Sequence, residues 1–167
     1  MGGSLANVTK QMVGLLRPDR KQQLLSNVQG KHFSMGTMCS GSDVCSDVLS
    51  TILQHAGGSH THVFSCEIVP AKQRWIMEKC SPRPKCLFEN VMDFVGSRAR
   101  CLIAGQHRAV PGTNVIFMGF SCKYVSHMSI YSAMSMDCIK QKSLRTGSAL
   151  SGGMQYIRRH RPKLVFL

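Results

Sequence analysis

The order of apolar and polar residues predicts strands and helices that alternate along most of the chain. Short apolar or alternating runs, typical of strands, occupy residues 33–38, 62–66, 85–88, 114–118 and 163–167. Runs with apolar residues at helical spacing lie around residues 44–53, 70–77 and 149–160. This alternation predicts β-α-β units, and therefore an α/β fold with a mostly parallel sheet and helices on both faces.

The first 31 residues differ from the rest, because Asp19 is their only acid. Helical spacing relates five apolar residues of this stretch, Leu5, Val8, Met12, Val13 and Leu16. Pro18 follows them and ends the pattern. We therefore predict a basic leader with a short helix at residues 1–31, and the α/β domain at residues 32–167.

The chain carries 21 Lys and Arg against 8 Asp and Glu, a formal net charge of +13. A surplus of this size favours a polyanionic partner such as nucleic acid, because bound phosphates release their counterions. Apolar residues make up 43% of the sequence, which is enough to form a core. The sequence shows neither a membrane-spanning apolar run nor a secretory signal, so we expect an intracellular protein without a membrane partner.

Eight cysteines are scattered without a CxxC pair, which argues against both a disulfide framework and a zinc site. His60 and His62 have no accompanying cysteine pair, so no metal site is predicted. We expect reduced thiols, most of them acting as small buried hydrophobic side chains.

Residues that could bind a ligand follow the predicted strands. In parallel sheets, ligands lie beyond the carboxyl ends of the strands. A glycine-containing turn, residues 39–43, follows the first strand and would let a cofactor approach the backbone. Glu67 ends the second strand, where a carboxylate can accept hydrogen bonds from ribose hydroxyls. Asp93, after the third strand, could bind an adenine amino group; for both acids the alternative is a solvated loop carboxylate.

Cys122 follows the buried strand at residues 114–118 and precedes Lys123. A cation beside a partly exposed thiol favours the thiolate, which makes Cys122 a candidate nucleophile; the alternative is a core cysteine. Three arginines, Arg158, Arg159 and Arg161, end the last predicted helix. They could contact phosphates or stabilise the C-terminal end of the helix.

Taken in order, these segments resemble the N-terminal part of the catalytic domain of cytosine-5 DNA methyltransferases. The resemblance rests on five segments: residues 33–43, Cys66-Glu67-Ile68-Val69-Pro70, Asp93-Phe94, Gly119-Phe120-Ser121-Cys122 and residues 146–167. It implies a Rossmann-like, S-adenosylmethionine-dependent methyltransferase fold, truncated after the fifth strand, with residues 32–167 as a partial catalytic domain. It also implies a DNA-binding protein, located in the nucleus if the source is eukaryotic.

The resemblance assigns a role to each candidate residue. Cys122 would attack carbon 6 of a flipped-out cytosine covalently, so that carbon 5 takes the methyl group. The cofactor would contact Cys39, Ser40, Gly41, Asp43, Glu67, Ile68, Asp93 and Phe94. Nucleic acid, DNA or alternatively RNA, would contact Lys123, Arg158, Arg159 and Arg161.

The sequence also departs from the family pattern. Cys39 replaces an aromatic residue, Asp43 a glycine and Ser121 the proline before the nucleophile. The family's Glu-Asn-Val segment, whose glutamate assists the reaction, would follow Leu167. We therefore expect weak or no activity from this chain alone, and a missing C-terminal half or larger assembly as its partner. Two alternatives stay open: a tRNA cytosine methyltransferase fragment, and a non-catalytic nucleic-acid-binding or scaffolding remnant of such an enzyme.

Overall fold

The computed structural model describes residues 5–119 and 144–167 and shows a central sheet. Within these residues the sheet has seven strands in the order β5-β4-β3-β2-β1-β6-β7. The strands are β1 (His32–Met38), β2 (Ser59–Cys66), β3 (Cys86–Phe88), β4 (Arg98–Cys101), β5 (Gln106–Ala109), β6 (Val115–Met118) and β7 (Leu164–Phe166). All neighbouring pairs from β3 to β7 across the sheet are parallel, which confirms the predicted fold class.

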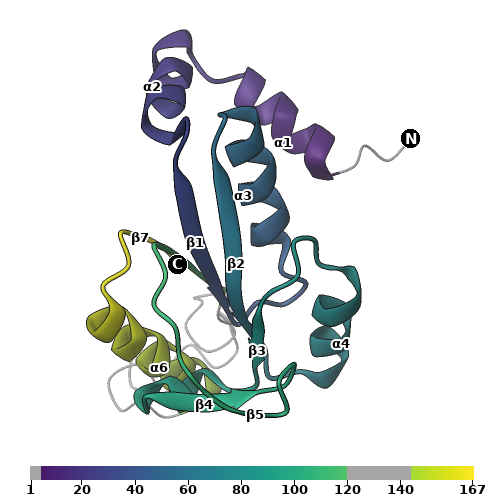
Figure 1. The fold of residues 1–167 in the computed structure, drawn as a ribbon, viewed down its shortest axis with the longest axis vertical. Coiled ribbons are helices and arrows are strands. Elements are labelled where there is room, and N and C mark those ends of the chain that lie inside the picture. Colours follow the sequence, from purple (N-terminus) through teal and green to yellow (C-terminus); the bar gives the residue numbers. More distant parts are fainter. Residues whose placement is uncertain (1–4, 120–143) are drawn as a thin grey trace, which may run out of the picture.

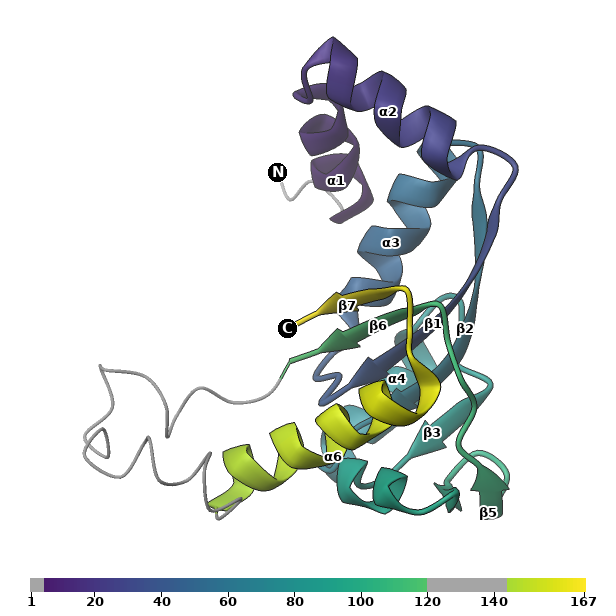
Figure 2. The same ribbon diagram turned by 90° about the vertical axis from the view of Figure 1, so that its left-hand side faces the viewer.

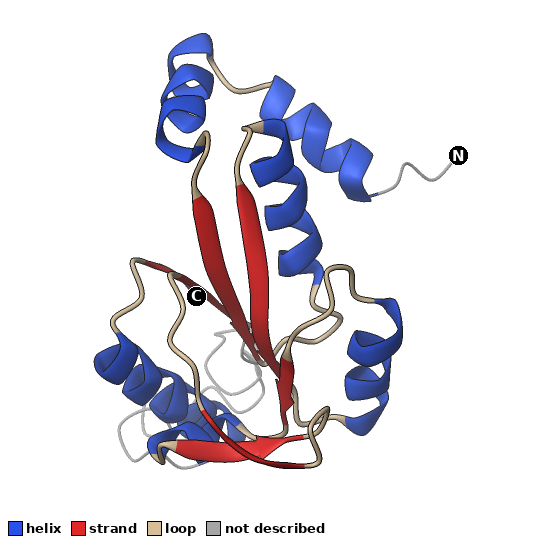
Figure 3. Ribbon diagram, viewed as in Figure 1, coloured by secondary structure: helices blue, strands red, loops and turns tan. Residues whose placement is uncertain are grey.

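Helices flank the central strands. They are α1 (Leu5–Gly14), α2 (Pro18–Val28), α3 (Val44–His55), α4 (Pro70–Lys79), the 3-10 helix η1 (Val91–Val95) and α6 (Leu144–His160). Figure 1 shows α3 and α4 to one side of the strands and α6 to the other, and Figure 3 gives the same view coloured by secondary structure. None of the helices within the described residues is both long and apolar enough to cross a membrane.

The N-terminal segment forms two helices rather than the single short one expected. Pro18 ends the pattern of α1, as predicted, but it also begins α2. Proline suits the first position of a helix because the N–H it lacks would have no partner there. Figure 2 shows α1 beside α3, where Val13 is buried.

Aromatic side chains fill the core between the sheet and α6. The Phe64 ring on β2 lies 5.5 Å from Phe94 of η1 and 5.5 Å from Tyr156 of α6, measured between centroids. Phe88 on β3 lies 5.8 Å from Phe64. Edge-on contacts of this kind stabilise a core beyond the area they bury. The cluster fixes η1 and α6 against the carboxyl half of the sheet.

A hairpin of β4 and β5 extends the sheet beyond β3 and was missed in the sequence. It places Cys101 beside Cys86 of β3, with Cα atoms 5.6 Å apart, and the two form a disulfide. The expectation that the thiols are reduced is therefore wrong for this pair. The pairing depends on an antiparallel neighbour of β3, which the spacing of the cysteines does not indicate.

The register of the strands aligns the ends of β1, β2, β3 and β6. Met38 lies opposite Cys66 on one side and Met118 on the other, and Cys66 lies opposite Phe88. The residues that follow these four strands therefore meet at one edge of the sheet. This edge is where a ligand is expected in a parallel α/β fold.

Candidate functional site

The turn after β1 has an uncommon backbone conformation. Cys39, Gly41 and Asp43 have φ angles of 52°, 60° and 59°, in the left-handed region. Glycine adopts this region readily, whereas each other residue costs about 1–2 kcal/mol there. Contacts elsewhere must therefore hold Cys39 and Asp43 in place.

Glu67, directly after β2, contacts this turn through its side chain. One carboxylate oxygen, Oε2, accepts a hydrogen bond of 2.7 Å from the Gly41 backbone N–H. The other, Oε1, accepts one of 2.9 Å from the Val69 N–H. The residue is 5% exposed, and its backbone carbonyl accepts a bond from Gln73 of α4. The carboxylate is therefore held at a fixed position at the sheet edge.

A pocket of about 440 Å³ lies beside Glu67. Its walls come from the ends of β1, β2 and β3, from the start of η1 and from α6. The lining residues are Cys39, Cys66, Glu67, Ile68, Val69, Pro70, Glu89, Asn90, Val91, Met92, Ser148 and Ala149. The volume is within the range of about 300–1,000 Å³ that is usual for small-molecule sites, and most of the walls are apolar.

Three of the predicted cofactor-binding residues line this pocket. They are Cys39, Glu67 and Ile68. Ile68 is 63% exposed, so its apolar side chain is available to a ligand. Burial raises the pKa of Cys39 to about 11, and the charge of Glu67 adds to the shift. Cys39 is therefore a neutral thiol at neutral pH and acts as part of the apolar wall.

Ser40, Gly41 and Asp43, which the sequence also predicts to contact the cofactor, support the pocket but are not among its lining residues. Ser40 bonds through its hydroxyl to the Cys66 carbonyl at 3.2 Å, and Gly41 to Glu67. Asp43 is 1% exposed and bonds inward to Thr37 and Ser65. These three residues fix the turn against β1 and β2.

Asp93 and Phe94, the predicted pair after the third strand, do not line the pocket. Phe94 is 1% exposed and belongs to the aromatic core, and Asp93 is exposed on η1 and does not line the pocket. Glu89 and Asn90, which come directly after β3, line it instead. The same rule that selected Glu67, the first polar residue past a buried strand, selects these two. The preference for an acid-plus-apolar pair led to Asp93 and Phe94.

Cys122 and Lys123 lie outside the described residues, so their predicted roles stay predictions. Gly119 is the last described residue before that gap, and it lies beside the end of β1. Gly119, after β6, donates a hydrogen bond of 3.0 Å to the Met38 carbonyl at the end of β1. Ser148 and Ala149 of α6 line the pocket itself.

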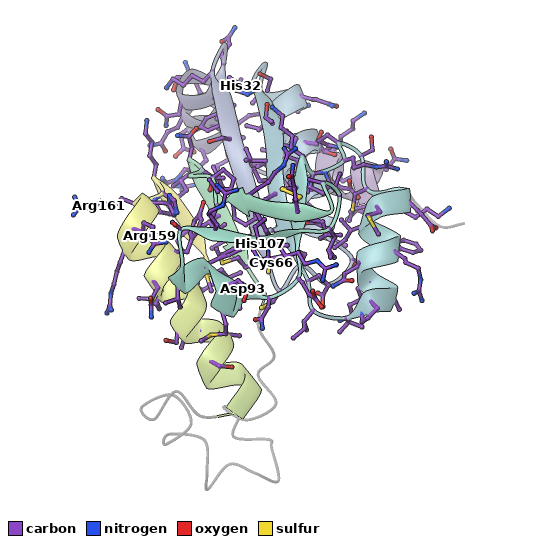
Figure 4. All side chains as sticks on the ribbon, turned by 60° about the horizontal axis from the view of Figure 1, so that its bottom comes forward. His32, Cys66, Asp93, His107, Arg159 and Arg161 are labelled. Carbon is purple, nitrogen blue, oxygen red and sulfur yellow. A yellow bond between two sulfur atoms is a disulfide. The ribbon has the colours of Figure 1, made fainter. Side chains whose placement is uncertain are left out.

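The three arginines at the end of α6 do not act alike. Arg159 donates to the carbonyls of Phe94 at 3.3 Å, of Val95 at 2.8 Å and of Gly96. It therefore joins α6 to η1 although its side chain is exposed, and its predicted contact with phosphate stays a prediction. Arg158 and Arg161 are exposed, and Figure 4 shows Arg161 pointing away from the body of the protein.

No group of three His, Cys, Asp or Glu side chains in the described part of the chain could hold a metal ion. The polar groups that line the pocket include the carboxylates of Glu67 and Glu89 and the amide of Asn90.

A scan against models of protein families finds no match, whereas comparison with curated proteins finds a similar sequence. The chain is 28% identical over 152 residues to the DNA (cytosine-5-)-methyltransferase DMT5 of Cryptococcus neoformans var. grubii. The match covers 87% of this chain but 6% of that protein, so the chain spans a small part of its relative's length. This match supports a relationship to methyltransferases.

Two solved structures are similar at low TM-scores. One is a protein from Pyrococcus horikoshii assigned as an RNA methyltransferase, with 11% identity, a TM-score of 0.38 and coverage of 79% of this chain and 55% of that one. The other is a precorrin-6y C5,15-methyltransferase from Geobacter metallireducens, with 15% identity, a TM-score of 0.34 and coverage of 87% and 71%.

Proposed function

We propose that this chain forms part of a methyltransferase that binds S-adenosylmethionine in the pocket beside Glu67 and methylates carbon 5 of cytosine in DNA. The observation that carries the proposal is the fixed carboxylate of Glu67 at the end of β2, facing the turn after β1. The sequence similarity to a cytosine-5 DNA methyltransferase supports the class of reaction.

The pocket suits the adenosine part of this cofactor. Each oxygen of Glu67 accepts one backbone N–H and keeps a further lone pair, which a ribose hydroxyl can use. Asn90 accepts a bond from the Met92 N–H through Oδ1, so its side-chain NH₂ is left to donate to a purine nitrogen. Ile68 and Met92 offer apolar surface to the flat base.

The proposed reaction needs a nucleophile from this chain. When bound, S-adenosylmethionine supplies an activated methyl group on a sulfonium. Cys122 would attack carbon 6 of the cytosine, which must first leave the base stack. Carbon 5 would then take the methyl group, and loss of the carbon 5 proton to a base would expel the Cys122 thiolate and restore the ring. Cys122 lies three residues after Gly119, whose N–H donates to the Met38 carbonyl at the end of β1.

DNA as the substrate is supported by charge and by the name of the relative. A net charge of +13 favours a phosphate backbone, and Arg158 and Arg161 are exposed cations. Both stand about 15 Å or more along α6 from Ser148 at the pocket, at a rise of ~1.5 Å per residue. They lie at the end of α6 remote from the cofactor pocket, so the phosphates that they would contact lie away from the reacting base.

Calorimetry with S-adenosylhomocysteine and with NAD tests the assigned ligand. A glycine turn after one strand and an acid after the next also occur in dinucleotide sites, so NAD is the matched competitor. We expect micromolar binding of S-adenosylhomocysteine and none of NAD. Binding of NAD alone, or of neither compound, would contradict the proposal.

Nucleic-acid titrations test the substrate. Fluorescence anisotropy with a DNA duplex and the RNA duplex of the same sequence should show tighter binding of DNA; a preference for RNA would contradict DNA as the target.

Trapping on 5-fluorocytosine DNA tests the nucleophile, because any covalent adduct must disappear in Cys122→Ser. An adduct that persists in this variant would exclude Cys122.

A further inference from the structure

A buried polar network lies directly behind the pocket turn. Asp43, the last residue of the turn, points its side chain into the protein and does not cap α3. Its Oδ2 accepts bonds from Thr37 of β1 at 3.2 Å and from Ser65 of β2 at 2.5 Å. His62 of β2 places Nε2 3.4 Å from the same oxygen. These four residues are at most 2% exposed.

The network connects to the pocket through the backbone of the turn. Asp43 donates its N–H to the Ser40 carbonyl at 2.7 Å, and Ser40 bonds to Thr37 through its hydroxyl at 2.7 Å. Cys39 and Gly41, on either side of Ser40, supply a pocket wall and the N–H that binds Glu67. Movement of Asp43 would therefore move both groups.

The hydrogen on one nitrogen of His62 can be assigned from its partners. Nδ1 lies 3.0 Å from the Pro82 carbonyl oxygen, which can only accept a hydrogen bond, and 3.2 Å from the Ser46 hydroxyl oxygen, which can accept as well as donate. Nδ1 therefore carries a hydrogen. The second nitrogen, Nε2, lies 2.9 Å from the hydroxyl oxygen of Ser65.

Ser65 has a single hydroxyl hydrogen but two close partners, Asp43 and His62. If it donates to Asp43, then Nε2 of His62 must carry a hydrogen to complete the other bond. If it donates to Nε2, then Asp43 must be protonated. Both arrangements need one proton more than a carboxylate and a neutral imidazole contain.

We propose that Asp43 and His62 share one proton through Ser65, and that this proton holds the turn that forms the pocket. Asp43 and His62 are then positioning residues, since neither touches the ligand. Loss of the proton leaves a carboxylate and an imidazole lone pair competing for one hydroxyl hydrogen. The turn loosens, Gly41 leaves Glu67, and the pocket binds its ligand less well.

Burial favours the protonated pair. Desolvation raises the pKa of Asp43 from its ordinary value of 3.8, although the nearby His62 opposes the shift. Oδ1 of Asp43 has no hydrogen-bond partner within the described structure, which disfavours a carboxylate further. The other titratable groups whose charges reach the pair are Asp47 and Cys45 of α3, His60 of β2 and Cys80 after α4.

The affinity for S-adenosylhomocysteine, measured across about pH 5 to 9, tests this inference. Because this ligand is the one assigned above, the inference rests on the proposed function. We expect the wild-type affinity to fall about tenfold as the pH rises, the effect of roughly one pKa unit. Asp43→Asn carries a permanent NH₂ donor toward Ser65 and should remove this pH dependence. Ser65→Ala, which removes the bridge, should weaken binding at every pH.

Asp47→Asn is the matched control, because it removes a charge that reaches His62 without entering the network. It should keep the wild-type pH dependence. A wild-type affinity that is constant with pH, or an Asp43→Asn profile that follows the wild type, would overturn the inference. Loss of the pH dependence in Asp47→Asn would do the same, since it would indicate general charge rather than the shared proton.

Hydrogen exchange of the Gly41 amide, followed by NMR without ligand, separates this inference from the proposed function. After correction for the intrinsic rate, protection should fall with rising pH in the wild type and stay constant in Asp43→Asn. This result together with no binding of S-adenosylhomocysteine would overturn the proposed function alone. Binding together with Gly41 protection that is equal in both proteins at every pH would overturn the inference alone.

Discussion

The side chain of Glu67 accepts a hydrogen bond of 2.7 Å from the backbone N–H of Gly41, across 26 residues of sequence. This bond joins the end of β2 to the turn after β1. It requires a carboxylate that reaches across the sheet edge and a turn whose N–H points toward it. The pocket forms where these two features meet.

Two adjacent glycines of α6 should lose different amounts of stability when changed to alanine. A Cβ at Gly152 would lie 2.6 Å from the Val91 carbonyl oxygen, which is backbone and cannot move aside. A Cβ at Gly153 would meet the flexible end of the Met118 side chain. We expect Gly152→Ala to lower the free energy of unfolding by about 1–3 kcal/mol. Gly153→Ala should cost less, because the Met118 side chain can move aside, whereas the gain in helix propensity of about 1 kcal/mol is common to both variants. Urea denaturation measures both, and equal losses would contradict the packing of α6 on η1.

Replacing Arg159 should lower the stability of the protein more than replacing Arg158. Arg159→Ala removes donors to three carbonyls of the η1 region and should lower the free energy of unfolding by about 1–2 kcal/mol. Arg158→Ala is the exposed control and should stay within about 0.5 kcal/mol of the wild type.

In DNA titrations, the double change Arg158→Gln, Arg161→Gln should reduce the slope of log affinity against log salt by about 1.8. An unchanged slope would exclude phosphate contacts at these two positions.

The Cys39 thiol should react slowly in spite of its place in the pocket. Its pKa of about 11 leaves little thiolate at neutral pH, because burial, and then the Glu67 charge, disfavour the anion. Alkylation by iodoacetamide, read by peptide mass spectrometry, should modify the exposed Cys45 before Cys39. Glu67→Gln should speed the reaction of Cys39 less than tenfold, roughly one pKa unit, since desolvation is the larger cause. Modification of Cys39 as fast as Cys45 would contradict this account.

Most of the parallel sheet could be predicted from the sequence, because its strands are short apolar runs separated by helical spacing. Glu67 and the turn at residues 39–43 followed from the rule that parallel strands deliver ligands at their carboxyl ends. The hairpin of β4 and β5 could not be found this way. Every residue of β5 is exposed, so the strand lacks the apolar alternation that marks an element in sequence.

The roles within the turn also could not be predicted. Asp43 and Glu67 are both acids that follow a strand, yet Asp43 turns inward to His62 and Glu67 faces the pocket. The direction of a side chain depends on the left-handed backbone at Asp43, which no local pattern indicates for a residue other than glycine. Phe94 was assigned to the cofactor for a similar reason, since an apolar residue after an acid fits either a pocket or a core.

Tyr156 should make the stability of the protein sensitive to high pH. Burial raises its pKa to about 12 from an ordinary value of 10.0. A raised pKa means that the folded state keeps the proton which the unfolded state loses, so stability is full below pH 10 and falls as the pH rises toward 12. The loss should approach about 1.4 kcal/mol per pH unit.

The matched variant is Tyr156→Phe, compared with the wild type by urea denaturation at each pH. It should be less stable by about 1 kcal/mol at neutral pH, because the Pro111 carbonyl loses its donor. The difference between the two proteins should shrink above pH 10. A difference that stays constant with pH would show that Tyr156 is not held neutral by burial.

The most direct test of the account is the affinity of Glu67→Ala for S-adenosylhomocysteine, measured by calorimetry beside the wild type. Glu78→Ala, an exposed acid on α4, is the matched control and should bind as the wild type does. Hydrogen bonds to a charged carboxylate contribute about 1.5–3 kcal/mol, so Glu67→Ala should bind roughly 10- to 150-fold more weakly. If Glu67→Ala remains folded by circular dichroism and binds as tightly as the wild type, Glu67 does not hold the cofactor, and the proposed site is wrong.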